Sequence, residues 1–389
     1  MHPVLAKRRT RRSLIWLPNH DPEYNDLLIG GDTMARLSLR VAARVAGAAV
    51  TGGFLLSRYL NYHPGPVECA EVSNTEGAPL LSPDQPINAI TFNVQFLAGT
   101  GYHFFYDGGP DGLAARSDIE STVAKVAAFI AETNPDFVLF QEVDCGARRT
   151  AYLDQVALLR GAMPAEIRNH VSTFYWKSKF VPHLKIMGSA GTKLVIFSRY
   201  RLGKARRYRL PHRPGNPLER DFGLKRAILE VEIPLADGRT LMLLNTHLDA
   251  FPKGTDVMER QIEKVLGRLK TLDDQNLAWI LGGDFNLLPP GQSARLNPQD
   301  RGIHREPTEL GSLCERYRGV PTVAAATGEH MRHYFTFTRR VGAIRLPVRT
   351  LDYFFVAPRV TIEDYAVVQE GTMDLSDHLP LTAHFRLSS

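Results

Sequence analysis

Several apolar runs of strand length in this chain end in a carboxylate, an amide or a histidine instead of in ordinary turn residues. These run endings are Asn93, Glu142, His247, the pair Asp284 and Asn286, and the pair Asp377 and His378. Strand ends at one edge of packed sheets converge on a common cleft, where binding and catalytic side chains gather. We therefore expect these residues to share one site.

The residue types at these endings are suited to the cleavage of phosphoesters. Carboxylates such as Glu142 and Asp377 suit Mg²⁺, Mn²⁺ or Ca²⁺, and we favour Mg²⁺. Histidines beside carboxylates or amides can neutralise charge on phosphoryl oxygens and protonate a leaving alkoxide. Taken singly, a Gln-Glu pair after a strand is usually a solvated turn, and an Asp-His pair is usually a structural hydrogen bond. Their combination along one chain predicts a metal-dependent hydrolase.

The elements that must position these residues follow a regular pattern from Ile87 onward. Short strands alternate with loops and a few amphipathic helices, and Asp237-Gly238 is a good hairpin turn between two of the strands. Strands are expected at 87–93, 137–141, 193–198, 226–233, 240–246, 278–282, 350–356, 366–368 and 379–385, and helices at 117–133, 154–160 and 255–272. The pattern thus mixes antiparallel hairpins with βα units.

From about Ile87 to Phe385 the chain resembles the endonuclease/exonuclease/phosphatase superfamily, which includes deoxyribonuclease-like and sphingomyelinase-like metal-dependent phosphohydrolases. The resemblance is carried by six motifs in the family's order and spacing: Phe92-Asn93-Val94, Gln141-Glu142, Asn245-Thr246-His247-Leu248, Gly283-Asp284-Phe285-Asn286, Leu351-Asp352-Tyr353 and Ser376-Asp377-His378. It implies an α+β fold, a four-layer α/β sandwich of two packed, mostly antiparallel sheets flanked by helices.

The resemblance also implies which residues would handle the metal. Glu142 would be its main ligand, and Asp377 would lie near it. Asn93 would orient Glu142 or contact the phosphate. Gln95 stands where the abasic-site endonucleases carry a carboxylate, so one metal ligand of that branch is missing.

The remaining motif residues would act on water and phosphate. By resemblance, Asp284 would position or deprotonate the attacking water, and Asn286 would stabilise the transition state. His378 would contact phosphoryl oxygens, with its tautomer fixed by Asp352. His247 would assist phosphate binding and leaving-group protonation. The reaction would be an in-line attack by water without a covalent intermediate.

Two lysines are candidate substrate contacts. Lys193 occupies a stretch that is Gly-Asn-Ala in many family members, and it would either contact the phosphate or face solvent. Lys253 follows the histidine motif, in a loop expected at the entrance of the cleft.

Three other stretches are expected to be loops at the mouth of the cleft. Residues 96–109 and 174–177 are rich in aromatic side chains, which would stack a base, contact a lipid or, as we favour, pack the loop onto the domain. Residues 199–213 contain seven Lys or Arg and no acidic residue. This last stretch is the best candidate for a nucleic acid or an anionic membrane, although such runs are usually solvated surface.

The segment before the catalytic domain has a different character. Residues 1–33 are expected to be an unstructured extension or a mis-assigned start. Residues 34–62 carry arginines followed by an apolar run of about 12 residues, short of the roughly 20 that cross a bilayer, so they predict a signal or membrane-associated segment. An amphipathic helix is the alternative. Residues 63–86 are expected to be a linker into the catalytic domain, 87–389.

The net charge of +6 says little about the catalytic domain, because residues 1–62 contain nine Lys or Arg against four Asp or Glu. The sequence therefore predicts a Mg²⁺- or Mn²⁺-dependent hydrolase of phosphoesters, most plausibly diesters. A membrane-associated or exported location of the bacterial-envelope type is favoured, and a cytoplasmic one stays open. Nucleic acid and phospholipid are the candidate substrates, and no obligate protein partner is inferred. A nuclease of the same fold and a non-catalytic binding module are the alternatives.

Overall fold

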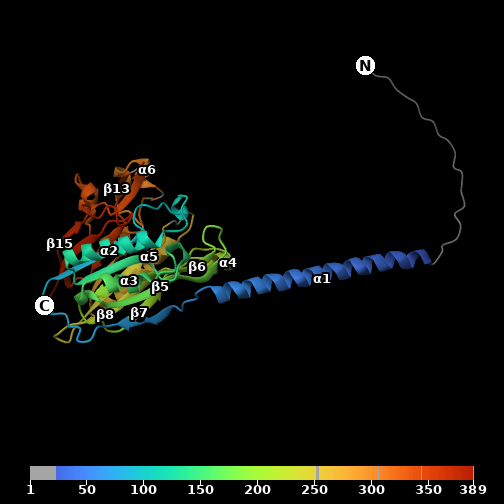
Figure 1. The fold of residues 1–389 in the computed structure, drawn as a ribbon, viewed down its shortest axis with the longest axis horizontal. Coiled ribbons are helices and arrows are strands. Elements are labelled where there is room, and N and C mark those ends of the chain that lie inside the picture. The colour runs from blue at the N-terminus through green and yellow to red at the C-terminus, as the bar shows by residue number, and fades with distance from the viewer. Residues whose placement is uncertain (1–22, 251–253, 303, 305, 343, 389) are drawn as a thin grey trace, which may run out of the picture. The chain divides into compact units, whose positions relative to one another are not determined.

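The computed structural model describes residues 23–388, apart from 251–253, 303, 305 and 343. The chain divides into two compact units, with the boundary between Leu56 and Ser57 (Figure 1). The catalytic motifs all belong to the second unit.

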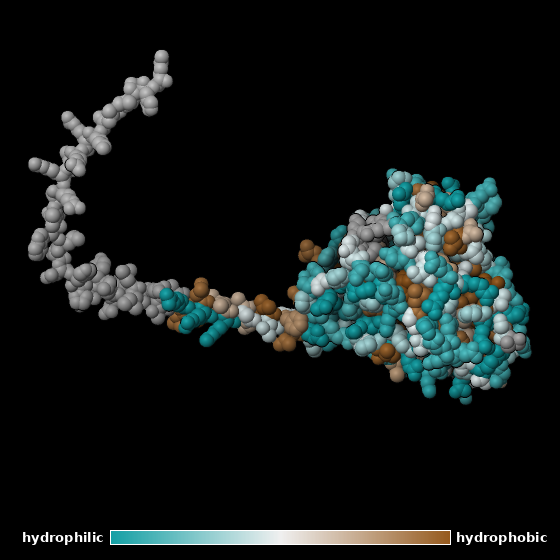
Figure 2. Space-filling model, turned by 180° about the vertical axis from the view of Figure 1, so that it is seen from behind, coloured by the Kyte–Doolittle hydropathy of each residue, from teal (hydrophilic) through white to brown (hydrophobic). Residues whose placement is uncertain are grey.

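The described part of the first unit is the helix α1, Glu23–Leu60, whose last four residues belong to the second unit. Residues 23–33, expected to be unstructured, are the first part of this helix, because no proline interrupts residues 23–60 and most of them favour or tolerate a helix; the rest of the expected extension, 1–22, lies outside the described residues. The described side chains from Arg36 to Leu56 are exposed, and hydrophobic residues recur along them (Figure 2). By length and composition, Arg36–Leu60 meets the criteria for a membrane span, which a signal sequence also meets.

The second unit is built on two seven-stranded sheets. One has the strand order β1-β7-β8-β9-β10-β14-β11, with bounds Val67–Ala70, Ala205–Arg209, Ala227–Pro234, Thr240–His247, Ala278–Asp284, Asp352–Val356 and Arg318–Val320. The other has the order β15-β16-β3-β4-β6-β5-β2, with bounds Val360–Val367, Leu381–Leu387, Ile87–Asn93, Phe137–Asp144, Gly188–Ser198, Asn169–Val181 and Val72–Ser73. Neighbouring strands are antiparallel except for β9–β10 and β3–β4. These sheets confirm the expected fold class.

The long helices α2 and α5 each bury one apolar face at helical spacing against the sheets. Helix α2 packs Ile119, Val123, Val126 and Ile130 into the same buried cluster as Phe92 and Phe140. The longer helices are α2 (Arg116–Thr133), α3 (Gln155–Ala162) and α5 (Val257–Asp274), and the shorter ones are α4 (Pro217–Phe222), α6 (Pro298–Arg301), α7 (Gly311–Arg316) and α8 (Val323–Thr327). A separate hairpin consists of β12 (Phe337–Val341) and β13 (Ile344–Arg349).

The expected linker, 63–86, is instead part of the folded unit. Strand β1 pairs with β7 at one sheet edge, β2 pairs with β5 at an edge of the other sheet, and Leu81 is fully buried. Both strands are short edge strands with polar residues, so they lack the apolar alternation that reveals a longer strand.

One of the three expected loops is a strand, and another contains one. Residues 174–177 lie inside β5, and the basic stretch 199–213 contains β7. The sequence of β7 does not show the alternation of apolar and polar residues that predicts a strand, because an arginine stands at a buried position: Arg207 is fully buried while Arg206 is exposed. The third stretch, 96–109, is a loop with two short 3₁₀ turns, and its Phe96 and Phe104 are buried, which confirms the favoured packing role.

Candidate active site

Strand register brings three of the expected residues side by side. Asp284 ends β10, and in that register it lies opposite His247 of the parallel strand β9 and Asp352 of the antiparallel strand β14. The preceding Gly283 has φ +154°, and a Cβ there would lie 2.1 Å from the Thr246 carbonyl oxygen. Only glycine therefore lets β10 approach β9 at this point.

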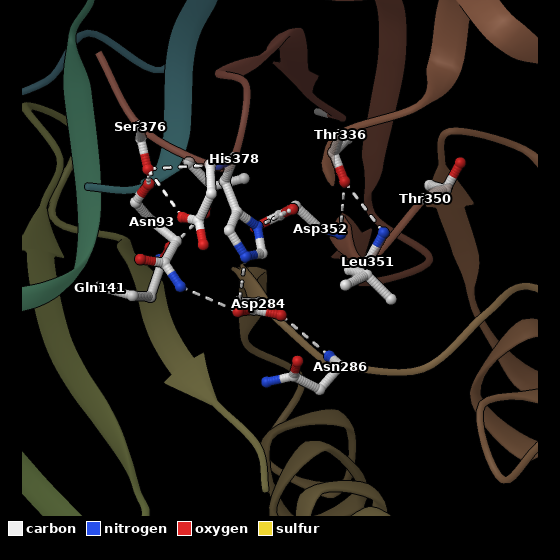
Figure 3. A network of polar contacts seen from close by, with 12 residues as sticks. Asn93, Gln141, Asp284, Asn286, Thr336, Thr350, Leu351, Asp352, Ser376 and His378 are labelled. Carbon is white, nitrogen blue, oxygen red and sulfur yellow. Dashed lines mark hydrogen bonds and ion pairs between the residues drawn. The ribbon is translucent and has the colours of Figure 1, made fainter. Parts of the chain in front are cut away.

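Asp284 is the centre of the constellation (Figure 3). Its Oδ2 accepts a hydrogen bond of 3.0 Å from Asn93 Nδ2, and its Oδ1 accepts one of 2.9 Å from the backbone N–H of Asn286. Its Oδ2 also lies 3.3 Å from His247 Nε2 and 3.6 Å from His378 Nε2. Burial raises the pKa of Asp284 to about 6, while the neighbouring His378 favours its ionised form.

His378 is held between two carboxylates. Its Nδ1 lies 2.8 Å from Asp352 Oδ2, and Asp352 is positioned by a backbone hydrogen bond of 3.0 Å to the Thr336 hydroxyl. Burial alone would lower the pKa of His378, but Asp352 and Asp284 together raise it to about 10. The ring is therefore protonated at neutral pH, with Nδ1–H donating to Asp352 and Nε2–H turned toward Asp284.

His247 has the opposite protonation state. Burial, with Arg226 and His378 acting in the same direction, lowers its pKa well below the usual value. Its ring packs against Tyr175 with a centroid distance of 5.6 Å, and its Nδ1 has no hydrogen-bond partner among the described residues. The site thus places one protonated and one neutral histidine beside the same carboxylate.

Glu142 and Asp377 form the acidic part of the site. Glu142 follows a bulge in β4, has φ +61° and is 19% exposed, with Oε1 lying 3.9 Å from His247 Nε2. Burial, and next the charge of Asp377, raise the pKa of Glu142 to about 8. Two carboxylates that repel each other in a buried site are relieved by a shared cation, and their oxygen donors fit Mg²⁺ or Mn²⁺.

A second group of donors lies nearby. One ligand atom each of Asp284, Asp352 and His378 lie within 4.8 Å of one another. The hydrogen bond of 2.8 Å between His378 Nδ1 and Asp352 Oδ2 already engages one ring nitrogen and one carboxylate oxygen of this group. Glu142 and Asp377, which lack such a bond to a cationic side chain among the described residues, fit a metal better.

Sequence reasoning missed two buried arginines beside Glu142. Arg149 lies over the Phe96 ring, 3.2 Å from its centroid, and makes a two-pronged ion pair with Asp144. Arg226 is 5% exposed, and its Nε and Nη1 have no hydrogen-bond partner among the described residues. Both charges favour the ionised form of Glu142. Neither arginine ends an apolar strand, which was the signal that identified the other residues.

The two candidate lysines are not brought into this constellation. Lys193 Nζ lies 3.2 Å from the Ser172 hydroxyl and 4.6 Å from the centroid of the Phe174 ring. Side chains alternate between the two faces of β6, so the preceding Thr192 points the opposite way from Lys193. Its hydroxyl forms hydrogen bonds with Arg149 and Asp144. A phosphate contact by Lys193 is therefore not supported. Lys253 lies outside the described residues.

Comparisons with known proteins concern the family and the fold. The sequence profile described as "Endonuclease/Exonuclease/phosphatase family" matches residues 90–378. A search of curated protein sequences found no match. Among solved structures, an endonuclease/exonuclease/phosphatase protein from Beutenbergia cavernae has 20% identity and a TM-score of 0.51, over 78% of this chain and 72% of its own.

Two other solved structures are similar at lower scores. The human Nocturnin catalytic domain with bound sulfate has 16% identity and a TM-score of 0.49, over 82% of this chain and 97% of its own. D. rerio TDP2 in complex with a single-strand DNA product has 16% identity and a TM-score of 0.48, over 78% of this chain and 100% of its own.

Proposed function

Since the chain belongs to the endonuclease/exonuclease/phosphatase family, whose members hydrolyse phosphoester bonds, we propose that it cleaves phosphodiesters with a divalent metal ion. The observation that carries the proposal is the set of contacts around Asp284. This buried carboxylate lies beside Asn93, Asn286 and both histidines. Asp352 supports this group from behind His378.

The metal site of the proposal consists of Glu142 and Asp377. A Mg²⁺ or Mn²⁺ ion bound there would neutralise charge on the phosphoryl oxygens. Its presence would also keep Glu142 ionised, because it offsets the repulsion from Asp377.

Asp284 is proposed to orient and deprotonate the attacking water. Hydrogen bonds from Asn93 and Asn286 hold the carboxylate in one orientation. Its pKa of about 6 leaves it ionised at neutral pH but makes it a stronger base than an exposed aspartate. Asn286 Nδ2 donates to the Leu248 carbonyl, which ties the loop after β10 to the loop after β9.

Cationic groups would complete the binding of the phosphoryl group. Protonated His378 can donate from Nε2 to a phosphoryl oxygen while Asp352 holds the other ring nitrogen. Arg226 supports an anionic ligand, because two of its guanidinium nitrogens have no hydrogen-bond partner among the described residues and a buried polar group without a hydrogen bond is costly. Neutral His247 carries no acidic proton for the leaving oxygen, so protonation of that oxygen would fall to the imidazolium of His378, while a ring N–H of His247 could donate a hydrogen bond to the phosphoryl group.

The test is turnover of bis-p-nitrophenyl phosphate by purified protein under Mg²⁺, Mn²⁺ and chelator. We expect metal-dependent cleavage, and a fall in kcat by about 10²–10⁴ in Asp284→Asn, which removes the base. Asp274→Asn is the matched control, because Asp274 is an exposed helix residue paired with Lys270. Equal rates in both variants would disprove the assignment.

A substrate panel then separates the alternatives. It contains p-nitrophenyl phosphate, DNA, RNA and sphingomyelin beside the diester. Preference for the monoester would assign a phosphatase, and cleavage of DNA or RNA without cleavage of the small esters would assign a nuclease. Protein that is folded yet inert toward every substrate under both metals would contradict the hydrolase proposal.

A further inference from the structure

Six exposed hydrophobic residues lie on three segments of the second unit that pack on one another. They are Tyr106 and Leu113, Tyr152, and Phe180, Leu184 and Met187, and we call them the apolar rim. Leu184 is 92% exposed and Tyr152 is 58% exposed. Such side chains are costly in water when they gather in one place, and they commonly mark a surface that contacts a partner or a membrane.

Printed contacts join the three segments into one surface. The ring of Phe105 stacks on that of His183 with a centroid distance of 4.8 Å, and Lys185 Nζ donates to the Pro110 carbonyl at 3.0 Å. Arg148 Nη1 donates to the carbonyl oxygens of Ile186 and Met187 at 2.6 and 3.0 Å. The tip of the β5–β6 hairpin is therefore held against the loop 96–113 and the turn 147–153.

The rim is accompanied by positive charge. Lys177, Lys179 and Lys185 are exposed on or beside the hairpin tip, and residues 169–192 contain no Asp or Glu. Exposed apolar side chains among lysines match the two layers of an anionic bilayer surface, its acyl boundary and its headgroups.

The chain itself connects this hairpin to the apolar helix. The candidate span ends at Leu60, and Asn61 then forms a β-bridge with Ser178 of β5. Lys179 Nζ lies 3.6 Å from the centroid of the Tyr59 ring, and Tyr59 is 69% exposed. Tyrosine and basic residues are typical of the interface at the end of a membrane span. Within the second unit, the end of the candidate span therefore lies beside the hairpin.

We propose that the apolar rim seats the catalytic unit on an anionic lipid bilayer. The rim also borders the candidate active site, because Arg149 of the same turn lies over Phe96, 5.6 Å from the Tyr106 ring centroid, and binds Thr192. Phosphoesters at the membrane surface would then be the substrates closest to the site. That last step rests on the proposed function, whereas the bilayer contact does not.

The test uses the full chain in vesicles and a fluorescent label that brominated lipids quench only on contact. Leu184→Cys carries the label, in a chain that also has Cys69→Ser, Cys145→Ser and Cys314→Ser. The matched control is Leu80→Cys, which is 44% exposed on the segment between β2 and β3, outside the three segments of the rim. Both labelled variants contain α1, so anchoring by α1 alone would affect the two labels equally.

We expect the label at position 184 to lose about half of its fluorescence in phosphatidylglycerol-containing vesicles and the label at position 80 to keep it. The loss should shrink in high salt and in a chain that carries Lys179→Gln with Lys185→Gln, since screened or deleted charges weaken the attraction. Equal quenching at both positions, or none at 184, would overturn the proposal. A response at position 184 to a single-stranded oligonucleotide but not to vesicles would overturn it too, in favour of nucleic acid.

Hydrogen exchange on the unmodified chain gives an independent measurement. Amides of residues 182–187 should exchange more slowly on anionic vesicles than in buffer, and those of the exposed β8–β9 turn, 236–239, should not change. The slower exchange of residues 182–187 on vesicles should be the same in an Asp284→Asn chain. Catalysis can therefore fail while the membrane contact stands, and the reverse.

Discussion

Arg226→Gln should lower activity strongly while leaving the fold intact. Arg226 is 5% exposed, its Nε lies at a long 3.9 Å from the Asp249 carboxylate, and neither Nε nor Nη1 has a hydrogen-bond partner among the described residues. A buried cation in this state contributes little to stability. The Arg226 guanidinium is instead available to donate hydrogen bonds to the oxygens of a bound phosphoryl group.

The expected loss follows from those two free donors. A hydrogen bond to a charged group is worth about 1.5–3 kcal/mol, so two of them amount to about 3–6 kcal/mol, or about 10²–10⁴ in kcat/KM. The free energy of unfolding should change by less than about 1 kcal/mol or rise. Asp249 stays held in the variant, because Gln261 donates to it at 2.9 Å. The assays are diester hydrolysis under Mg²⁺ and urea unfolding.

Arg268→Gln is the control with the opposite expectation. Arg268 binds both oxygens of Glu230 at 2.6 and 2.8 Å, and Glu230 is 2% exposed. Its loss leaves a buried carboxylate without its partner, which should cost about 3–5 kcal/mol of stability but leave kcat/KM of the folded protein unchanged. The reasoning is refuted if Arg226→Gln retains wild-type kcat/KM, or if it destabilises the protein as much as Arg268→Gln does.

Three further predictions concern the site and its surroundings. Asp352→Asn removes the carboxylate that holds His378 Nδ1 at 2.8 Å, so kcat should fall by about 10²–10⁴, and unchanged diester turnover would contradict this role. Glu142→Gln removes the main proposed ligand, so Mg²⁺ binding measured by calorimetry should be lost; binding at wild-type affinity would move the metal elsewhere. Burial, and next the charge of Lys225, lower the pKa of His212 from 6.5 to about 4. In this pH range the unfolded chain is protonated at His212 while the folded chain is not. The free energy of unfolding should therefore fall as the pH is lowered from about 6.5 to about 4, and His212→Gln should remove this part of the fall.

The strand endings were readable from the sequence because they combine two local signals. A strand such as 87–93 is recognised by its apolar run, and its last residue by a polar type that does not suit a simple turn. The helix 117–133 was likewise visible through Ile119, Val123, Val126 and Ile130, whose spacing predicts one buried face. Both signals lie within a few residues, so they need no knowledge of the fold.

The edge strands and the basic strand could not be recognised in this way. Strand β2 is two residues long, and β7 alternates arginines whose burial depends on what lies above them. Arg207 is buried because its Nε reaches the carbonyl of Phe174 on β5. A partner supplied by a distant strand leaves no trace in the local pattern.

The sequence by itself determined the chemistry available at the site: two carboxylates suited to a metal, a carboxylate between two amides, and two histidines. Only the tertiary structure decided how these groups are used. The register of β9, β10 and β14 places His247, Asp284 and Asp352 side by side, and this proximity makes one histidine cationic and leaves the other neutral. The same packing brings Arg226 to the site. Residue type sets what a side chain can do, whereas burial and neighbouring charge set its protonation and its partners, and both arise only when distant strands meet.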